Sequence, residues 1–268
     1  MANHIPSLTL LVRKLSRTSR SILGLADDGN LYVVKFLDNR DMHDSLFSEC
    51  VGTDFYHACG LSVPGWRTLQ ISSKLMDLNL DCWVNERGEG TRPTEGLCFG
   101  SRFLAASRHA YPILPESYYQ DIVNRRSVWL ALFLDYCGFT ASKRTALFCK
   151  VGRSHYEAAF VKHGNSSTVR DQNSVAQLMA CAYPDKRIYP CFSPEDVKGI
   201  RDVFRGLDTS QLLQQCDLVP EEWTSANEHA AWLEQLNGLW DRKALDWWID
   251  DFCATVRQSP LQGLCRYF

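Results

Sequence analysis

The chain has 268 residues, of which 45% are hydrophobic and 22% charged, an ordinary balance for a globular protein of one large domain or two lobes. Its formal net charge of -2 disfavours a protein held to nucleic acid by bulk electrostatic attraction. No apolar run reaches the roughly 18 residues of a membrane helix, and the first residues lack the regions of a signal peptide. We therefore expect a cytoplasmic protein without membrane contact.

The first third of the chain predicts strands around one helix. Apolar runs alternate with turn residues, and the segment 27–30 (Asp-Asp-Gly-Asn) is a strong hairpin signal. A stretch with apolar residues at helical spacing follows and stops at a glycine. The expected elements are strands over 7–15, 21–26, 31–37 and 63–71, and a helix over 45–59 that ends at Gly60.

The rest of the chain predicts helices. The composition of residues 85–96 is typical of a loop or lobe junction, and we place a cleft near residues 85–100. A helix is expected over 115–136, another begins at Ser193 with proline at its first position, and a last one is capped by Asp241. Strands first and helices after indicate an α+β fold.

The cysteines invite a metal or disulfide interpretation, which their spacing does not support. There are eleven, an odd number, and no pair has the CxxC spacing. Free cysteine usually behaves as a small core residue. The sequence therefore favours reduced, buried thiols over zinc or redox sites, and we predict no metal site.

Lys35 is the most informative residue, because it lies inside an otherwise apolar strand. Burial of an ammonium group costs several kcal/mol unless a partner or an anionic ligand compensates it. Glu49 follows fourteen residues later within the predicted helix. A strand lysine held by a helix glutamate is how protein kinases grip the phosphates of ATP. The simpler alternative is an exposed lysine on an edge strand.

Several segments resemble the bacterial HipA-like kinase family, in particular its compact, single-chain branch. They carry the lysine strand, the helix glutamate, the turn after that helix, the entry to the large lobe, and the flanks of the catalytic and metal loops. These segments are 28–36, 48–49, 60–64, 99–103, 132–135 and 163–164. The resemblance covers roughly residues 10–170. It implies a two-lobed, protein-kinase-like α+β fold, with a β-rich N-lobe over 1–96 and a larger helical C-lobe over 97–268.

The catalytic motifs depart from the family pattern. In the catalytic loop Thr140 stands for the asparagine and Ser142 for the aspartate, and in the metal loop Lys162 stands for the aspartate before His163 and a glycine. The glycine-rich turn is also altered, over residues 17–21. Phosphoryl transfer needs one carboxylate to orient the attacking hydroxyl and another to hold magnesium. Ser142 is neutral and Lys162 repels magnesium, so we expect this chemistry to be lost.

The resemblance therefore implies a pseudokinase that binds a nucleotide or another phosphate-bearing ligand and acts through a protein partner. Lys162 would place a fixed positive charge where magnesium would lie, so ATP could bind without the metal. The degenerate positions are Thr140, Ser142 and Lys162, and the expected ligand-binding residues are Lys35, Glu49, Lys162, Arg20, Ser21 and His163. His163 alone is more often structural than catalytic.

Two alternatives remain open at this point, so the sequence does not decide whether the protein is an enzyme. One is an active ATP-dependent kinase or nucleotidyl transferase with relocated acids, for which Asp135 and Glu157 are the nearest candidates. We interpret Asp135 as the end of a helix and Glu157 as a strand residue. The other is an interaction protein whose cleft is occluded.

Overall fold

The computed structural model describes residues 4–15, 21–37, 46–83, 92–107, 109–139, 145–161, 163 and 175–263. By packing, the chain forms two units. Unit 1 comprises residues 1–46 and 64–107, and unit 2 comprises residues 47–63 and 108–268. Each unit is described in turn below.

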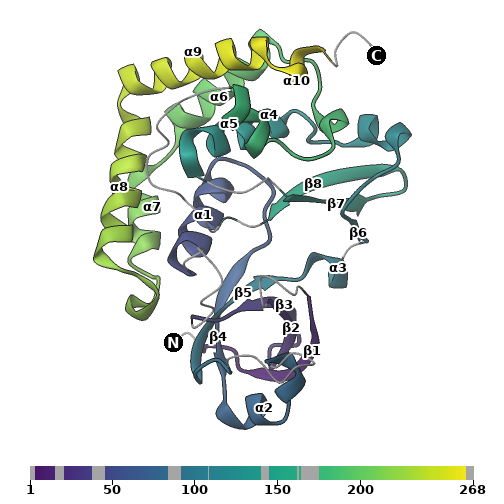
Figure 1. Ribbon diagram of the computed structural model, residues 1–268, viewed down its shortest axis with the longest axis vertical. Helices are drawn as coiled ribbons and strands as arrows, with labels where there is room; N and C mark the ends of the chain where they lie inside the picture. The colour runs from purple at the N-terminus through teal and green to yellow at the C-terminus, as the bar shows by residue number, and fades with distance from the viewer. Residues whose placement is uncertain are drawn as a thin grey trace. The chain divides into compact units, whose positions relative to one another are not determined.

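Unit 1 is built on a five-stranded antiparallel sheet with the strand order β1-β2-β3-β5-β4 (Figure 1). A parallel bridge between Ser7 and Gln70, in which the Gln70 N–H donates to the Pro6 carbonyl at 2.9 Å, links the two ends of that order. The sheet therefore curls around its buried hydrophobic residues. Its strands are β1 (Leu8–Lys14), β2 (Ile22–Ala26), β3 (Leu31–Lys35), β4 (Trp66–Ile71) and β5 (Gly96–Arg102), with two short helices, α2 (Ser73–Asp77) and α3 (Leu104–Ser107).

Helix α1 (Leu46–Ala58) packs into unit 2. The Phe55 ring lies 4.6 Å from that of Phe139 and 5.9 Å from that of Trp232. Gly60 has a φ of 79°, the left-handed conformation that commonly ends a helix, so the predicted stop is confirmed. In this division into units, α1 belongs to unit 2 through these contacts, and β5 belongs to unit 1 because it pairs with β3 and β4.

The remainder of unit 2 is a small sheet and a set of helices (Figure 1). The sheet has the order β6-β7-β8, with β6 (Ala110–Tyr111), β7 (Thr145–Val151) and β8 (His155–Val161). The helices are α4 (Ser127–Leu134), α5 (Val175–Cys181), α6 (Pro194–Gly206), α7 (Thr209–Cys216), α8 (Ala226–Trp240), α9 (Arg242–Gln258) and α10 (Pro260–Gly263). None of the helices in the described part of the chain is long and apolar enough to cross a membrane.

Two helix starts in unit 2 follow the sequence signals. Ser193 and Asp196 form a capping box at the start of α6, and the Asp241 side chain accepts a hydrogen bond from the Lys243 N–H at the start of α9. Both predicted starts are therefore confirmed. A short helix, α10, still follows α9.

The helix predicted over 115–136 is confirmed only in its C-terminal part, and its expected N-terminal part is wrong. A 3₁₀ turn covers Glu116–Asp121, and α4 begins only at Ser127. Between them the Val123 N–H donates to the Tyr156 carbonyl at 2.8 Å, and the Asn124 side chain bonds the backbone of Ala158 in both directions. These hydrogen bonds to β8 satisfy backbone groups that a helix would otherwise use.

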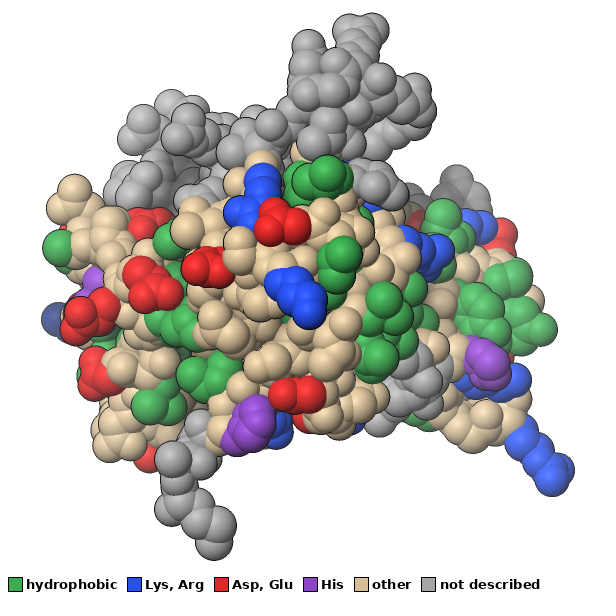
Figure 2. All heavy atoms as spheres, turned by 90° about the horizontal axis from the view of Figure 1, so that it is seen from below, with side chains coloured by type: hydrophobic (Ala, Val, Ile, Leu, Met, Phe, Trp, Pro, Cys, Tyr) green, Lys and Arg blue, Asp and Glu red, His purple; other side chains and the backbone are tan. Residues whose placement is uncertain are grey.

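Most of the described cysteines are buried free thiols. Burial raises the pKa of the Cys59 and Cys98 thiols, to about 12 in the case of Cys98, which keeps them protonated and unreactive. The described surface mixes both signs of charge with hydrophobic groups on the face that Figure 2 presents, in keeping with the small net charge.

Candidate functional site

Lys35 lies at the end of β3, an interior strand hydrogen-bonded to β2 on one side and β5 on the other. Side chains alternate along a strand, and Tyr32 and Val34 belong to the buried hydrophobic cluster of unit 1. Lys35 therefore projects from the opposite face of the sheet, where it is only 8% exposed. This placement differs from that of a solvated lysine on an edge strand.

Glu49 lies in the first turn of α1 and is 3% exposed. Its Oε2 accepts a hydrogen bond from the backbone N–H of His163 at 3.3 Å. That N–H belongs to the peptide that joins His163 to Lys162. The helix glutamate is thus bonded directly to the loop in which the resemblance places the altered metal position. Lys35 and Glu49 fall in different units, so their pairing stays a prediction.

His163 is held inside unit 2, with 2% of its surface exposed. Its Nε2 lies 3.1 Å from the Phe160 carbonyl oxygen, and since a carbonyl only accepts, Nε2 carries the proton. The ring lies 4.6 Å from that of Tyr56. A Cβ on Gly52 would come within 2.9 Å of the His163 Cβ and carbonyl oxygen. Glycine at position 52 is therefore what lets α1 approach this residue so closely.

A buried tyrosine and carboxyl group complete this arrangement. The Tyr56 hydroxyl donates to the Asp135 carboxyl, which is fully buried where α4 ends, and the Cys181 thiol donates to the Asp135 carbonyl at 3.6 Å. We call Glu49, Tyr56, Asp135 and His163 the buried polar cluster. In a low-dielectric interior its hydrogen bonds are strong and costly to break.

The buried polar cluster changes how two residues are understood. Tyr56 was not singled out in the sequence, where no local pattern distinguishes it from other helix tyrosines. Asp135 was considered as a relocated acid, but its carboxyl group faces the interior and bonds Tyr56, in keeping with its interpretation as a helix end. Glu157 lies half-buried on β8, with Cys149 opposite, also as a strand residue.

Of the remaining predicted site residues, the structure describes only Ser21. Ser21 is buried at the start of β2, where its carbonyl accepts from the Leu15 N–H at 2.9 Å. Thr140, Ser142, Lys162 and Arg20 lie outside the described residues. Among the described residues, no group of three or more His, Cys, Asp or Glu side chains is arranged to hold a metal ion.

The chemistry of the buried polar cluster suits it to hold residue 163 in place, and suits it less to transfer protons. The bonds from Tyr56 to Asp135 and from the His163 N–H to Glu49 join interior groups, and the His163 proton on Nε2 is committed to the Phe160 carbonyl. The arrangement therefore fixes α1, the end of α4 and residue 163 together within unit 2.

The structure is similar to the crystal structure of a Helicobacter pylori proinflammatory kinase, CtkA, with a TM-score of 0.54 and 11% sequence identity. The similarity covers 94% of this chain and 98% of that one. No family model and no curated protein sequence matches the chain. At this identity the likeness concerns the fold, and it confirms the predicted kinase-like α+β architecture. Membership of the HipA-like family stays a prediction.

Proposed function

We propose that the chain is a pseudokinase of the HipA-like kind, which binds a nucleotide or another phosphate-bearing ligand without magnesium and acts through a protein partner. The observation that carries the proposal is the hydrogen bond from the His163 N–H to Glu49. In this proposal the bond ties the helix glutamate to the loop that holds the metal in HipA-like kinases, where the resemblance places Lys162 in the position of an acid.

The charge change at position 162 reverses what the loop can bind. A carboxylate at a metal position attracts magnesium, which in turn bridges the phosphates of ATP. An ammonium group repels magnesium but pairs with phosphate oxygens as a point charge. In this proposal the side chain of Lys162 takes over part of the metal's role in neutralising the ligand.

Lys35 supplies the second cation. It lies on β3, which in this proposal is the strand that carries the phosphate-gripping lysine of a kinase, and it is mostly buried. Burial of an ammonium group costs less when an anion compensates its charge. Without catalytic acids the protein would not transfer the phosphoryl group of bound ATP, so its output would be a change in affinity for a partner.

Calorimetric titration with ATP tests this proposal. We expect the wild-type protein to bind ATP in excess EDTA, and Lys35→Ala to weaken binding at least about tenfold, which corresponds to about 1.4 kcal/mol. Lys162→Asp should make binding depend on magnesium. Lys14→Ala, which removes an exposed lysine from β1 of the same unit, is the matched control and should bind as the wild type does.

Two results would contradict the proposal. Strictly magnesium-dependent ATP binding by the wild type would indicate a working acid pair and an active transferase. Absence of binding in both buffers, with the folded state confirmed by circular dichroism, would favour an interaction protein whose cleft is closed.

A further inference from the structure

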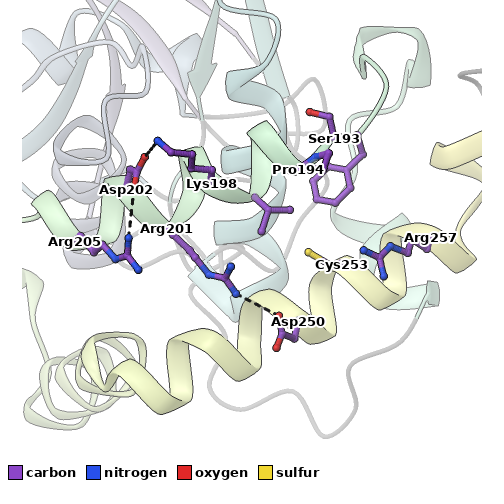
Figure 3. Close-up of a pocket in the computed structure, with 11 residues that line it drawn as sticks. Ser193, Pro194, Lys198, Arg201, Asp202, Arg205, Asp250, Cys253 and Arg257 are labelled. Carbon is purple, nitrogen blue, oxygen red and sulfur yellow. Dashed lines mark hydrogen bonds and ion pairs between the residues drawn. The ribbon is translucent and has the colours of Figure 1, made fainter.

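A groove runs between α6 and α9 in unit 2, with a volume of about 710 Å³ (Figure 3). This is the size of a cleft that takes a small molecule or a short peptide segment. Its residues come from the entry and outer face of α6 and from the second half of α9. They are Phe192, Ser193, Pro194, Val197, Lys198, Arg201, Asp202, Arg205, Asp250, Cys253 and Arg257.

Three of the four cations in the groove form a row along α6. Lys198, Arg201 and Arg205 are spaced by three and four residues, which puts them on one side of a helix. Asp202 on the same helix pairs with Lys198 at 2.6 Å and lies 3.8 Å from Arg205. Two cations of the row thus share one carboxylate.

The third cation of the row bridges the two helices. Arg201 pairs with Asp246 at 3.3 Å and with Asp250 at 3.4 Å, both on α9. Its Nε is buried without a hydrogen-bond acceptor of suitable geometry. The three aspartates that pair with the row are Asp202, Asp246 and Asp250. Three negative charges against the four cations of the groove leave one positive charge uncompensated.

Arg257, on the last turn of α9, is the cation with which that excess is associated. In the part of the chain that the structure describes, its guanidinium group forms no hydrogen bond or ion pair with another residue. Figure 3 shows Arg257 at the end of the groove away from Arg205. Phe192 and Val197 are half-buried in the same groove and add apolar surface to it.

We propose that this groove binds an acidic peptide segment of a partner protein. One carboxylate pairs with Arg257, others approach the Lys198 and Arg205 side, and an apolar side chain covers Phe192 and Val197. A peptide fits better than a free anion because Lys198 and Arg205 are exposed, and a single exposed ion pair contributes at most about 1 kcal/mol. Several linked charges and apolar contact are needed to hold an occupant.

The groove shares no residue with the proposed ligand site of Lys35, Glu49 and Lys162. Peptide binding can therefore be measured without nucleotide, and its failure leaves the ATP titration unaffected. In the same way, a failed ATP titration leaves the peptide measurement unaffected.

The test uses a fluorescein-labelled peptide, Glu-Glu-Leu-Asp-Glu-Phe-Glu-Glu, and fluorescence anisotropy with the full chain. We expect saturable binding that weakens as the NaCl concentration rises, and a comparison peptide with Gln and Asn in place of every acid should bind at least about tenfold more weakly. Arg257→Gln should weaken binding about fivefold, and Lys198→Gln combined with Arg257→Gln should weaken it further.

Arg242→Gln provides the matched control, because it removes the same charge from α9 outside the groove. It should leave peptide affinity within about twofold of the wild type. Equal binding of the acidic and amide peptides would overturn the proposal, as would equal losses in Arg257→Gln and Arg242→Gln. Binding of inorganic phosphate in place of the peptide, lost in Arg257→Gln, would replace the peptide groove with a small-anion site.

Discussion

The buried polar cluster and the groove between α6 and α9 hold their charged and polar groups in opposite ways. In the cluster, Glu49, Asp135 and His163 are nearly inaccessible, and they form hydrogen bonds with other interior groups. In the groove, Lys198 and Arg205 are exposed and share one carboxylate. A buried polar group that loses its hydrogen-bond partner has no water to replace it, so the folded state is destabilised. A solvated group that loses its partner bonds water, and the loss in stability is small.

We therefore expect substitutions in the cluster to affect stability and substitutions in the groove to affect binding. Changes in the buried polar cluster should lower the free energy of unfolding, because a lost hydrogen bond there is not replaced by water. Changes in the groove should mainly alter binding, since surface substitutions usually change stability by no more than about 0.5 kcal/mol. A groove substitution that unfolds the protein would contradict this distinction.

Tyr56→Phe is the substitution with the largest expected effect. It removes the hydroxyl that donates to the buried Asp135 carboxyl, and we expect a loss of about 1.5–3 kcal/mol in the free energy of unfolding. Urea unfolding followed by circular dichroism measures this loss. Tyr118→Phe is the control, because that side chain is 41% exposed, and its change should stay within about 0.5 kcal/mol. Equal effects of the two would show that the Tyr56 hydroxyl bond contributes nothing.

Gly52→Ala tests the close approach of α1 to His163. The new Cβ would lie 2.9 Å from the His163 Cβ and carbonyl oxygen, an overlap that costs about 1–3 kcal/mol and exceeds the gain of up to about 1 kcal/mol from replacing a helix glycine. We expect a net loss of about 1–2 kcal/mol in thermal or urea unfolding.

Gly199→Ala, within α6, is the matched control for this effect. Nothing lies within 4 Å of a Cβ at that position, so the same substitution should stabilise the protein by up to about 1 kcal/mol. A lower free energy of unfolding for Gly52→Ala and a higher one for Gly199→Ala would support the distinction between the buried polar cluster and the exposed positions of α6. A stabilising Gly52→Ala would contradict the packing described around His163.

Local patterns account for the features that the sequence predicted well. The apolar run over 31–37 after the turn at 27–30 predicted strand β3, the glycine at position 60 predicted the end of α1, and Ser193 with Pro194 predicted the start of α6. The kinase-like fold was predicted from a resemblance in short motifs, and the structural similarity confirms it. Each of these signals lies within a few residues of the feature that it marks.

Long-range contacts account for what the sequence could not predict. Tyr56 and Asp135 are 79 residues apart, and no local pattern announces their hydrogen bond. Asn124 was assigned to a helix because its neighbours have helical spacing, yet its side chain bonds Ala158 on β8 and the helix begins later. Tertiary hydrogen bonds outweighed local propensity at that position.

Asp185 lies between the two extremes and should show a smaller, pH-dependent effect. Its hydrogen bond from Arg187, with a further one from Tyr119, lowers the pKa of the carboxyl group to about 2. The folded pKa lies below the unfolded value of about 3.9, so the pair stabilises the protein above about pH 4 and loses this contribution as the pH falls toward 2.

Because Arg187 is 39% exposed and its charge is partly screened, we expect Asp185 to contribute only about 1 kcal/mol near neutral pH. Urea unfolding of Asp185→Asn and the wild type across this pH range measures it, and the difference between the two should shrink as the solution becomes acidic. A difference that stays constant with pH would mean that the carboxylate's charge does not contribute. In that case Asp185 would stabilise the fold through hydrogen bonds that do not depend on its charge.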